Sequence, residues 1–249
     1  MITTPLISVI TVVFNGQEHI GRTIASVTNQ TYRHIEYIII DGKSTDKTLD
    51  VIAGLEGIDL LVSEPDSGLY DAMNKGLSKA TGDYVWFLNS GDEIYSRDTV
   101  EKMVAGLEGM PDIIYGGTMI IDEKQNEIGD RRLKPPDQLS WKSFRQGMVV
   151  CHQSILVKRE KAPAYNLDYR LSADFDWVTR AVKDAAQTHN SRLILSRFLE
   201  GGLTRHNIKA GLKERFKIMR QIYGLIPTLL RHFVFGARLT NYYLRHRRF

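Results

Sequence analysis

Short apolar runs separated by polar turns recur through the first ninety residues. These runs are rich in β-branched and aromatic side chains and cover residues 7–14, 35–40, 58–62 and 84–88, and the last of them shows no alternation of apolar and polar positions. Apolar runs of this length are typical of strands that are covered on both faces of a sheet. We therefore expect four strands in this half of the chain, of which those at 7–14, 35–40 and 84–88 are buried.

The segments between these strands predict amphipathic helices. Apolar residues recur at intervals of three and four, as in Ile20, Ile24 and Val27,. Further helices are predicted through Leu49 and Ile52 and over residues 69–80. Strands that alternate with helices predict an α/β fold with a mainly parallel sheet and right-handed crossovers.

The second half of the chain has a weaker pattern. Apolar runs predict strands at 112–122 and 154–157, and a helix that begins at Ser172,. Two adjacent glycines in the first of these strands allow a bulge or a close backbone approach. Residues 124–146 are predicted to form irregular loops that face an acceptor.

Three aspartates, Asp41, Asp66 and Asp92, follow predicted strands. Because the carboxyl ends of parallel strands meet at one edge of a sheet, we expect these side chains to share a crevice. Carboxylates gathered without a cation would repel one another, which favours a ligand or metal site. Alternatively, each aspartate is a turn residue, and Asp92 caps a helix that follows Ser96.

The composition narrows the choice of function. The 249 residues are 43% hydrophobic and can bury one large core, and the single cysteine, Cys151, excludes an intramolecular disulfide,. Neither a G-x-x-x-x-G-K-[ST] loop nor a G-x-G-x-x-G after the first strand is present, and no Cys/His metal cluster occurs,. A bound nucleotide would therefore depend on a divalent ion held through Asp92.

Four motifs in this order resemble glycosyltransferase family 2, and in particular bacterial exopolysaccharide enzymes of the colanic-acid type. They are ISVITVVFN (7–15), IIDGKSTDKT (39–48), SEPDSGLYDAMNKG (63–76) and FLNSGD (87–92). The resemblance extends over about residues 7–205. It implies a GT-A fold, which is a Rossmann-like and mainly parallel sheet flanked by helices. It also implies a nucleoside-diphosphate sugar donor, a divalent Mg²⁺ or Mn²⁺ ion, and inversion at the anomeric carbon.

The resemblance assigns the donor site to the first three strand ends. Thr11, Phe14 and Asn15 match the residues that line the nucleoside pocket. Asp41 matches the acid that reads the base, and Asp66 lies in the loop that flanks the pocket.

Two departures from the family pattern concern the diphosphate. Asn74 and Lys75 fall where many relatives have Arg-Asn near the diphosphate, but Met73 occupies the arginine position, so Lys75 is the candidate substitute. The fourth strand commonly ends in Asp-x-Asp-Asp, whereas this chain has Asn89, Ser90, Gly91 and Asp92. We expect the first three of these residues to contact the substrate and Asp92 to bind a metal that enters with the donor.

The catalytic base is expected at the start of the helix that follows Ser172. Asp174 matches the family's base, although Ala173 replaces the acid that usually precedes it. Aspartate is ordinarily ionised at neutral pH and can accept a proton. His152 resembles a histidine of the active site in relatives. Alternatively, Asp174 and Asp176 only stabilise the helix dipole, and His152 is an ordinary hydrogen-bonding residue.

The charge is divided unevenly along the chain. Residues 201–249 hold 11 Lys or Arg and one acid, Glu214, for a net charge of +10, whereas residues 1–200 carry 22 basic and 28 acidic residues, for −6. Basic residues mixed with apolar and aromatic ones at helical spacing predict an amphipathic helix that meets an anionic membrane surface. The alternatives are a helix docked on its own domain, or nucleic-acid binding, for which no accompanying motif is found.

These features predict one GT-A domain over residues 1–205, with a nucleotide-sugar half (1–92) and an acceptor half (93–205), followed by a basic helical extension (206–249). We expect an inverting transferase that acts on a glycan or lipid-linked glycan at the inner face of the cytoplasmic membrane. No signal peptide and no stretch of 18 uninterrupted apolar residues is found,. The competing interpretation is a non-catalytic nucleotide-sugar-binding or regulatory module.

Overall fold

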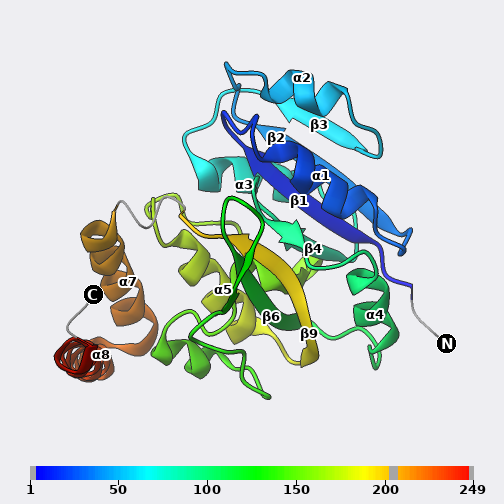
Figure 1. Cartoon of the computed structure of the whole chain (residues 1–249). Coiled ribbons are helices and arrows are strands. Elements are labelled where there is room, and N and C mark those ends of the chain that lie inside the picture. Colours follow the sequence, from blue (N-terminus) through cyan, green and yellow to red (C-terminus); the bar gives the residue numbers. More distant parts are fainter. Residues whose placement is uncertain (1–3, 202–206, 247–249) are drawn as a thin grey trace.

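A nine-stranded mixed sheet forms the centre of the computed structural model, which describes residues 4–201 and 207–246 (Figure 1). The strands lie in the order β3-β2-β1-β4-β8-β6-β9-β5, and β7 pairs with β6 outside this path. The strands are β1 (Ile7–Val13), β2 (Ile35–Asp41), β3 (Leu60–Ser63), β4 (Tyr84–Phe87), β5 (Glu93–Ile94), β6 (Ile113–Ile121), β7 (Glu127–Asp130), β8 (Ile155–Lys158) and β9 (Thr188–Leu199).

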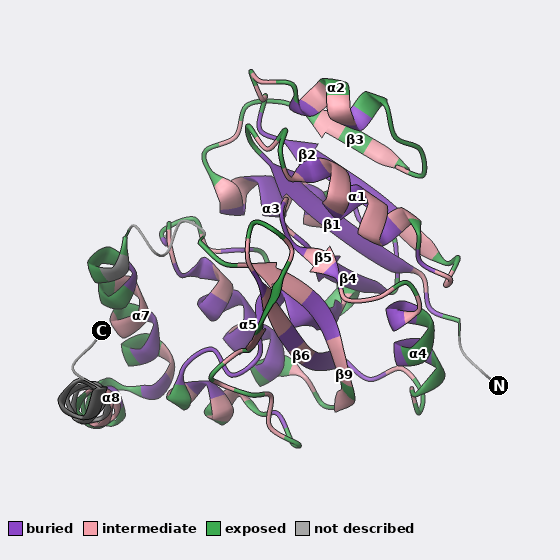
Figure 2. Ribbon diagram, in the orientation of Figure 1, coloured by how far each residue is buried: buried purple, intermediate pink, exposed green. Residues whose placement is uncertain are grey.

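The first four strands are parallel, as the apolar runs predicted. β1 pairs with β2 and β4, β2 pairs with β3, and every residue of β1 and β4 is buried (Figure 2). Because all four strands run the same way, the loops that follow them leave from one edge of the sheet. Phe14, Asn15 and Asp66 belong to those loops and Asp41 ends β2, whereas Thr11 lies within β1 and Asn74 and Lys75 lie in the helix after β3.

Helices cover both faces of this half of the sheet. The elements are α1 (Ile20–Thr28), α2 (Thr48–Ala53), α3 (Leu69–Lys79) and α4 (Thr99–Ala105). α1 buries Ile20, Ile24 and Val27 in one apolar cluster, as predicted, whereas α3 packs in a second cluster on the opposite face. α3 approaches β1 closely because Gly76 has no side chain; a Cβ there would overlap Ile10 Cγ2.

The second half of the sheet is mixed rather than parallel. β8 lies between β4 and β6 and is antiparallel to both, whereas β9 runs parallel to β6. The register between β6 and β9 shifts beside Gly116 and Gly117, as expected. The two strands also approach closely there, since a Cβ on Gly116 would lie 2.5 Å from the Leu193 carbonyl oxygen. Residues 124–146, predicted to be irregular, contain β7 and the 3₁₀ helix η1 (Trp141–Gln146).

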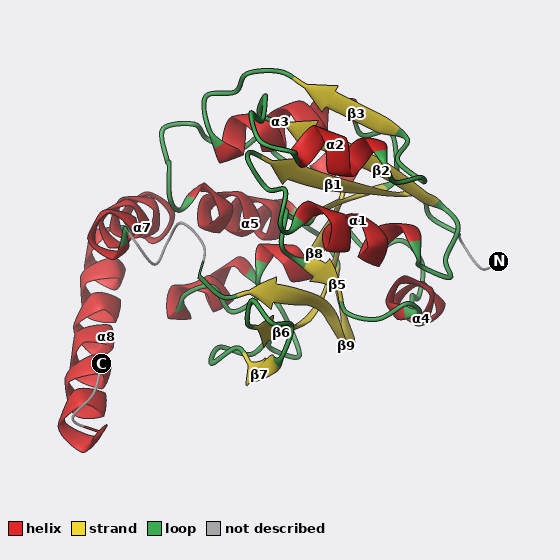
Figure 3. Ribbon diagram, turned by 45° about the horizontal axis from the view of Figure 1, so that its top comes forward, coloured by secondary structure: helices red, strands yellow, loops and turns green. Residues whose placement is uncertain are grey.

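The remaining helices follow the sheet. α5 (Ala173–Asp184) begins after Ser172, as predicted, and two short 3₁₀ helices, η2 (His152–Ser154) and η3 (Arg159–Lys161), flank β8. α7 (Ile208–Tyr223) lies beside α5, and α8 (Leu225–His246) projects away from the sheet (Figure 3). Within the part of the chain that the structure describes, no helix is both long and apolar enough to cross a membrane.

Candidate functional site

The loops after β1 and β2 interlock at the edge of the sheet. Asn15 adopts a left-handed conformation with φ of 49°, and its backbone N–H donates to Ser44 Oγ at 2.8 Å. The Asn15 side-chain oxygen accepts a hydrogen bond from the Thr45 N–H at 2.9 Å. Asn15 therefore fixes the second loop against the first.

Phe14, Gly42 and Asp66 lie together in this region. The Phe14 ring is 63% exposed, and Asp66 is half-buried and accepts a hydrogen bond from the Gly68 N–H at 2.8 Å. A Cβ on Gly42 would overlap Asp66 Oδ2 and would lie 3.4 Å from the Phe14 ring, so the bare glycine brings the two side chains together. An exposed aromatic ring can stack on a nucleoside base. A carboxylate beside the ring can accept hydrogen bonds from the N–H groups of that base.

Two predicted donor residues are enclosed instead of exposed. The Thr11 hydroxyl is fully buried and pairs with the Tyr37 hydroxyl at 3.1 Å. Asp41 is also fully buried and accepts hydrogen bonds from Ser63 Oγ at 2.6 Å and from the Ser44 N–H at 3.0 Å. In this structure Asp41 joins the loops after β2 and β3, and Thr11 belongs to the core.

Asn74 and Lys75, both in α3, bind other parts of the protein. The Asn74 amide donates to the Tyr165 carbonyl at 3.0 Å and accepts from the Tyr165 N–H at 2.7 Å. Lys75 Nζ bonds to the Pro65 carbonyl at 2.7 Å and pairs with Glu64 at 2.9 Å. The Lys75 contacts stabilise the loop that carries Asp66, and the expected role of Asn74 and Lys75 near the diphosphate stays a prediction.

The turn after β4 holds a deeply buried carboxylate. Asp92 is 4% exposed and accepts hydrogen bonds from Gln153 Nε2 at 2.8 Å and from the Leu199 N–H at 3.2 Å. Burial raises the pKa of Asp92 to about 7, although both hydrogen bonds favour the charged form,. Gln153 in turn accepts a hydrogen bond from Cys151 Sγ at 2.6 Å. Asp92 caps no helix, because the cap position of α4 is Asp98.

The same turn offers oxygen atoms that suit a hard cation. Asn89 Oδ1 and Ser90 Oγ are buried and have no hydrogen-bond partner within the described ranges, 4–201 and 207–246. These two atoms and the Asp92 carboxylate are the oxygen donors that Mg²⁺ and Mn²⁺ prefer, and a ligating carboxylate is commonly held by hydrogen bonds such as those on Asp92. Gly91, with φ of 101°, permits the turn,. The described residues include no cluster of three or more His, Cys, Asp or Glu suited to a metal, so the fit requires ligands from the donor.

The predicted base, His152 and a tyrosine form a second cluster at the start of α5. His152 Nδ1 lies 3.7 Å from Asp174 Oδ2, and the Tyr70 hydroxyl donates to Asp174 Oδ1 at 3.5 Å. Burial lowers the pKa of His152, so the ring is neutral at pH 7,. Its other nitrogen, Nε2, lies 3.5 Å from Asn89 Nδ2. The side chain of Asp174 remains 23% exposed. The cluster therefore joins the turn after β4 to an accessible carboxylate.

Aromatic side chains whose role the sequence did not indicate support this cluster. Tyr70 stacks on Tyr165 at 5.5 Å between ring centroids, and Tyr165 stacks on Trp177 at 5.1 Å. Burial raises the pKa of Tyr70, and the negative charge of Asp174 acts in the same direction, so the hydroxyl stays protonated and can donate. Tyr70 lies inside the motif at 63–76, and its place in that motif was the feature of the sequence that could have indicated a role in the site.

Glu214 of α7 holds the loop that leads to Asp174. Its carboxylate accepts hydrogen bonds from the backbone N–H groups of Arg170 at 3.0 Å, Leu171 at 2.8 Å and Ser172 at 3.0 Å. Ser172 precedes the first residue of α5. The single acid of the basic extension is thus committed to the backbone beside the candidate base, a contact that its position in the sequence could not reveal.

Comparison with known proteins identifies relatives along the whole chain. The sequence model of Glycosyl transferase family 2 matches residues 8–162. An uncharacterized glycosyltransferase of Mycobacterium tuberculosis is 33% identical, over 100% of this chain and 94% of the relative. A PGL/p-HBAD biosynthesis glycosyltransferase of the same species is 31% identical over 80% of this chain and 79% of the relative.

Solved structures share the fold at low sequence identity. S. aureus TarS 1-349 in complex with UDP-GlcNAc superposes with a TM-score of 0.73 at 17% identity, over 87% of this chain and 65% of that one. The mannosyltransferase PcManGT of Pyrobaculum calidifontis, in complex with GDP-Man and Mn²⁺, gives a TM-score of 0.64 at 15% identity, over 88% of this chain and 64% of that one. This chain therefore spans slightly less than two thirds of each solved chain, and the fold is GT-A.

Proposed function

Since the chain belongs to glycosyl transferase family 2, we propose that it is an inverting enzyme that transfers a sugar from a nucleoside-diphosphate donor to an acceptor hydroxyl. The acceptor we favour is a lipid-linked glycan of bacterial surface polysaccharide synthesis. Relatives supply the context, because one is named for glycolipid biosynthesis and solved structures of the same fold hold UDP-GlcNAc or GDP-Man.

The observation that carries the proposal is the partly exposed Asp174 carboxylate, held beside His152 and Tyr70. A general base must be ionised and reachable by the proton that it removes, and Asp174 is the exposed member of this cluster,. Hydrogen bonds from Tyr70 and from the Phe175 N–H orient one carboxylate oxygen and leave the other next to His152.

The reaction is an in-line displacement. Asp174 removes the proton of the acceptor hydroxyl while that oxygen forms a bond to the anomeric carbon. The bond from the anomeric carbon to the diphosphate oxygen breaks, its electron pair leaves with the nucleoside diphosphate, and the configuration inverts. Phe14 and Asp66 hold the nucleoside at the other end of the crevice, which keeps the reacting atoms in register.

A divalent Mg²⁺ or Mn²⁺ ion fits this site through Asp92, together with the oxygens of Asn89 and Ser90,. When bound, it would supply positive charge to the departing diphosphate. Asp92 is the only carboxylate in the turn, so most of the remaining ligands must be phosphate oxygens and water. We therefore propose that metal and donor bind together.

The C-terminal helix α8 supports a peripheral membrane location. Leu225, Ile226, Leu229, Leu230 and Phe233 are each at least 50% exposed and fall on one side of the helix,. Residues 225–249 contain five arginines and no acid. An exposed apolar row within a cationic segment suits the interface of an anionic membrane.

Asp174→Asn is the direct test of the catalytic assignment. The substitution keeps the shape of the side chain and removes its basicity, so transfer should fall by about 10² to 10⁴ while donor affinity stays unchanged. Hydrolysis and transfer would be assayed with a panel of nucleotide sugars and Mn²⁺, and donor binding by calorimetry. Asp92→Ala should lose donor binding that depends on the metal. Transfer at the wild-type rate by Asp174→Asn would exclude this base, and a wild-type protein that binds donors without hydrolysing them would favour the binding-module alternative.

A further inference from the structure

The proposed donor site is short of positive charge. The departing diphosphate is anionic, yet the turn after β4 keeps one metal-binding carboxylate and Met73 stands where relatives have arginine. Lys75, the expected substitute, pairs with Glu64 at 2.9 Å and lies 3.8 Å from Asp71. A transfer site built in this way requires a cation from elsewhere in the fold, and this step of the inference rests on the proposed function.

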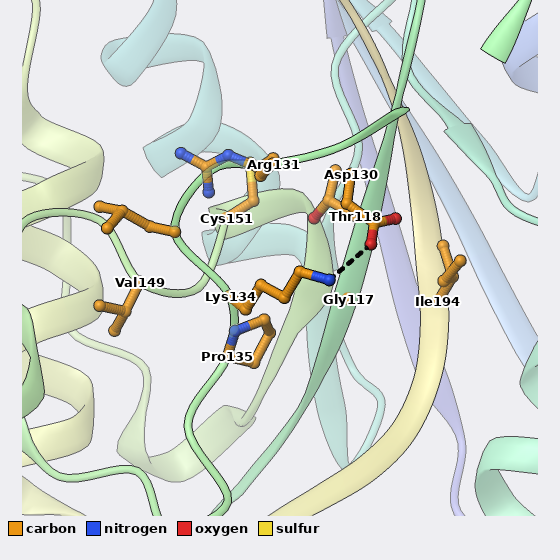
Figure 4. A pocket seen from close by; sticks show the side chains of 10 residues that line it. Gly117, Thr118, Asp130, Arg131, Lys134, Pro135, Val149, Cys151 and Ile194 are labelled. Atoms are coloured by element: carbon orange, nitrogen blue, oxygen red, sulfur yellow. Dashed lines mark hydrogen bonds and ion pairs between the residues drawn. The ribbon is translucent and has the colours of Figure 1, made fainter. Parts of the chain in front are cut away.

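Arg131 lines a small cavity between β6, β9 and the segment that follows β7 (Figure 4). The cavity has a volume of about 120 Å³, and Thr118, Lys134 and Cys151 are among the residues around it. Arg131 Nη1 is buried and has no hydrogen-bond partner, and no ion pair of Arg131 is found among the described residues. Lys134, in the same cavity, is already paired with Asp130 at 2.9 Å.

The cavity adjoins the reacting groups. Cys151 contributes to its wall and directly precedes His152, which contacts Asp174. The charge of Arg131 reaches this cluster: it adds to the burial that lowers the pKa of His152, and it opposes the burial that raises the pKa of Cys151. Arg180 and Arg197, by contrast, are held by ion pairs, with Asp176 and Glu127 respectively.

We propose that Arg131 is a phosphate-binding residue of the transfer site. A guanidinium group presents parallel N–H donors that match two oxygens of one phosphate, and a buried N–H without a partner is costly unless a ligand completes it. The phosphate belongs either to the leaving diphosphate or to a prenyl phosphate that carries the acceptor.

The test compares the full-length wild type with Arg131→Gln, Arg131→Lys and the control Lys134→Gln. Calorimetry would measure the affinity for inorganic pyrophosphate, UDP and GDP with Mn²⁺, and separately for farnesyl phosphate. Arg131→Gln should weaken one of these two groups of probes by about tenfold to a hundredfold. Arg131→Lys should recover part of the loss, and Lys134→Gln should change little. A loss for the diphosphates assigns the site to the donor, and a loss for farnesyl phosphate assigns it to the acceptor.

Thermal unfolding separates this role from a structural one. Because Arg131 has no hydrogen-bond or ion-pair partner among the described residues, Arg131→Gln should unfold at the wild-type temperature or above it,. Unchanged affinity of Arg131→Gln for every probe would overturn the inference and leave the proposed function intact, provided that the wild type binds nucleoside diphosphates. If the wild type bound UDP and GDP no better than pyrophosphate, while Arg131→Gln lost pyrophosphate, the phosphate site would stand and the donor function would fail.

Discussion

At the scale of single residues, the site contains two aspartates whose surroundings suit different tasks. Asp92 is enclosed, and burial raises its pKa to about 7, so a cation that displaces its proton would stabilise the charged form,. Asp174 keeps 23% of its side chain exposed and can meet an acceptor hydroxyl. The sequence assigned both roles by resemblance, and the difference in burial gives each role a physical reason.

Gly42 should accept a side chain only if Asp66 moves. In Gly42→Ala the new Cβ would overlap Asp66 Oδ2 and would lie 3.4 Å from the Phe14 ring. We expect weaker binding of the nucleoside with little change in the free energy of unfolding, because the overlapping atom is the end of a side chain that can turn aside,. Gly54→Ala is the matched control, because its Cβ would come no closer than 3.6 Å to another atom. Urea unfolding and calorimetry with nucleosides would measure both effects, and equal behaviour of the two variants would contradict a nucleoside site at Gly42.

His152 should make stability depend on pH. Burial lowers its pKa in the folded chain, against the attraction of Asp174 and with the help of Arg131. As the pH falls, His152 therefore takes up a proton at a higher pH in the unfolded chain than in the folded one. The contribution of neutral His152 to the free energy of unfolding is present above about pH 6.5 and is lost as the pH falls below that value. His152→Gln should show a smaller loss of unfolding free energy between pH 8 and pH 5.5. Parallel pH profiles for the two proteins would contradict a buried neutral histidine.

At the scale of elements, sequence patterns predicted the parts of the fold that are buried on both faces. β1 and β4 were recognisable because every position is apolar or enclosed. β9 was not predicted, since most of its residues are only half-buried and Arg192 interrupts the strand with φ of 57°. The antiparallel direction of β8 follows from long-range pairing, which a local pattern does not encode.

The sequence likewise predicted only part of the candidate site. Motif matches located Asp92, Asp174 and His152, which the structure brings into one connected region. They could not show that Thr11 is enclosed by Tyr37 or that Asn74 binds the Tyr165 backbone, because those contacts join residues 26 and 91 positions apart. Arg131 and Glu214 lie outside the quoted motifs, and only the folded chain places them near the base.

The contact between α7 and the start of α5 should matter for catalysis. Glu214→Ala would leave three N–H groups of residues 170–172 without their acceptor, at a cost of about 1–3 kcal/mol in unfolding free energy,. The displaced loop should lower the turnover number of transfer, because it precedes Asp174, and leave the donor dissociation constant unchanged.

Lys213→Ala provides the control for Glu214, since Lys213 is exposed on the same helix. Fixed-time transfer assays would measure the turnover number, and calorimetry would measure the donor dissociation constant. A Glu214→Ala protein that lost stability but kept its turnover number would restrict Glu214 to a purely structural role.

At the scale of the whole molecule, the basic extension has two different parts. α7 buries Ile218, Met219 and Tyr223 in the same apolar cluster as Phe87 and Phe175, and Trp141 stacks on Tyr223 at 5.4 Å. α8 presents its apolar row outward. Not every apolar side chain of α7 faces this cluster, because Leu212 is 55% exposed while Ile218 is buried. The division at residue 205 stays a prediction, and the last three residues of the extension lie outside the described part.

Truncation at two points tests this division of labour. A chain that ends at residue 201 would lose the burial of Ile218, Met219 and Tyr223, which contributes roughly 5–9 kcal/mol. That amount is comparable to the whole stability of a typical domain, so this chain should aggregate or unfold. A chain that ends at Gly224 keeps these contacts and should remain folded, as judged by circular dichroism and a cooperative thermal transition. Stable folding of the shorter chain would show that α7 is dispensable for the core.

Membrane binding should follow α8 rather than α7. The full chain should float with vesicles that contain anionic lipid, and the chain that ends at Gly224 should not. Because the truncation also removes charge, a full-length variant with Ile226→Ser and Phe233→Ser is the matched control: both side chains are more than 70% exposed, so the fold should be unaffected while flotation is lost,. The proposed membrane location would fail if this variant floated as well as the wild type. It would also fail if the wild type were a dimer and the variant a monomer, because the apolar row would then be a dimer interface.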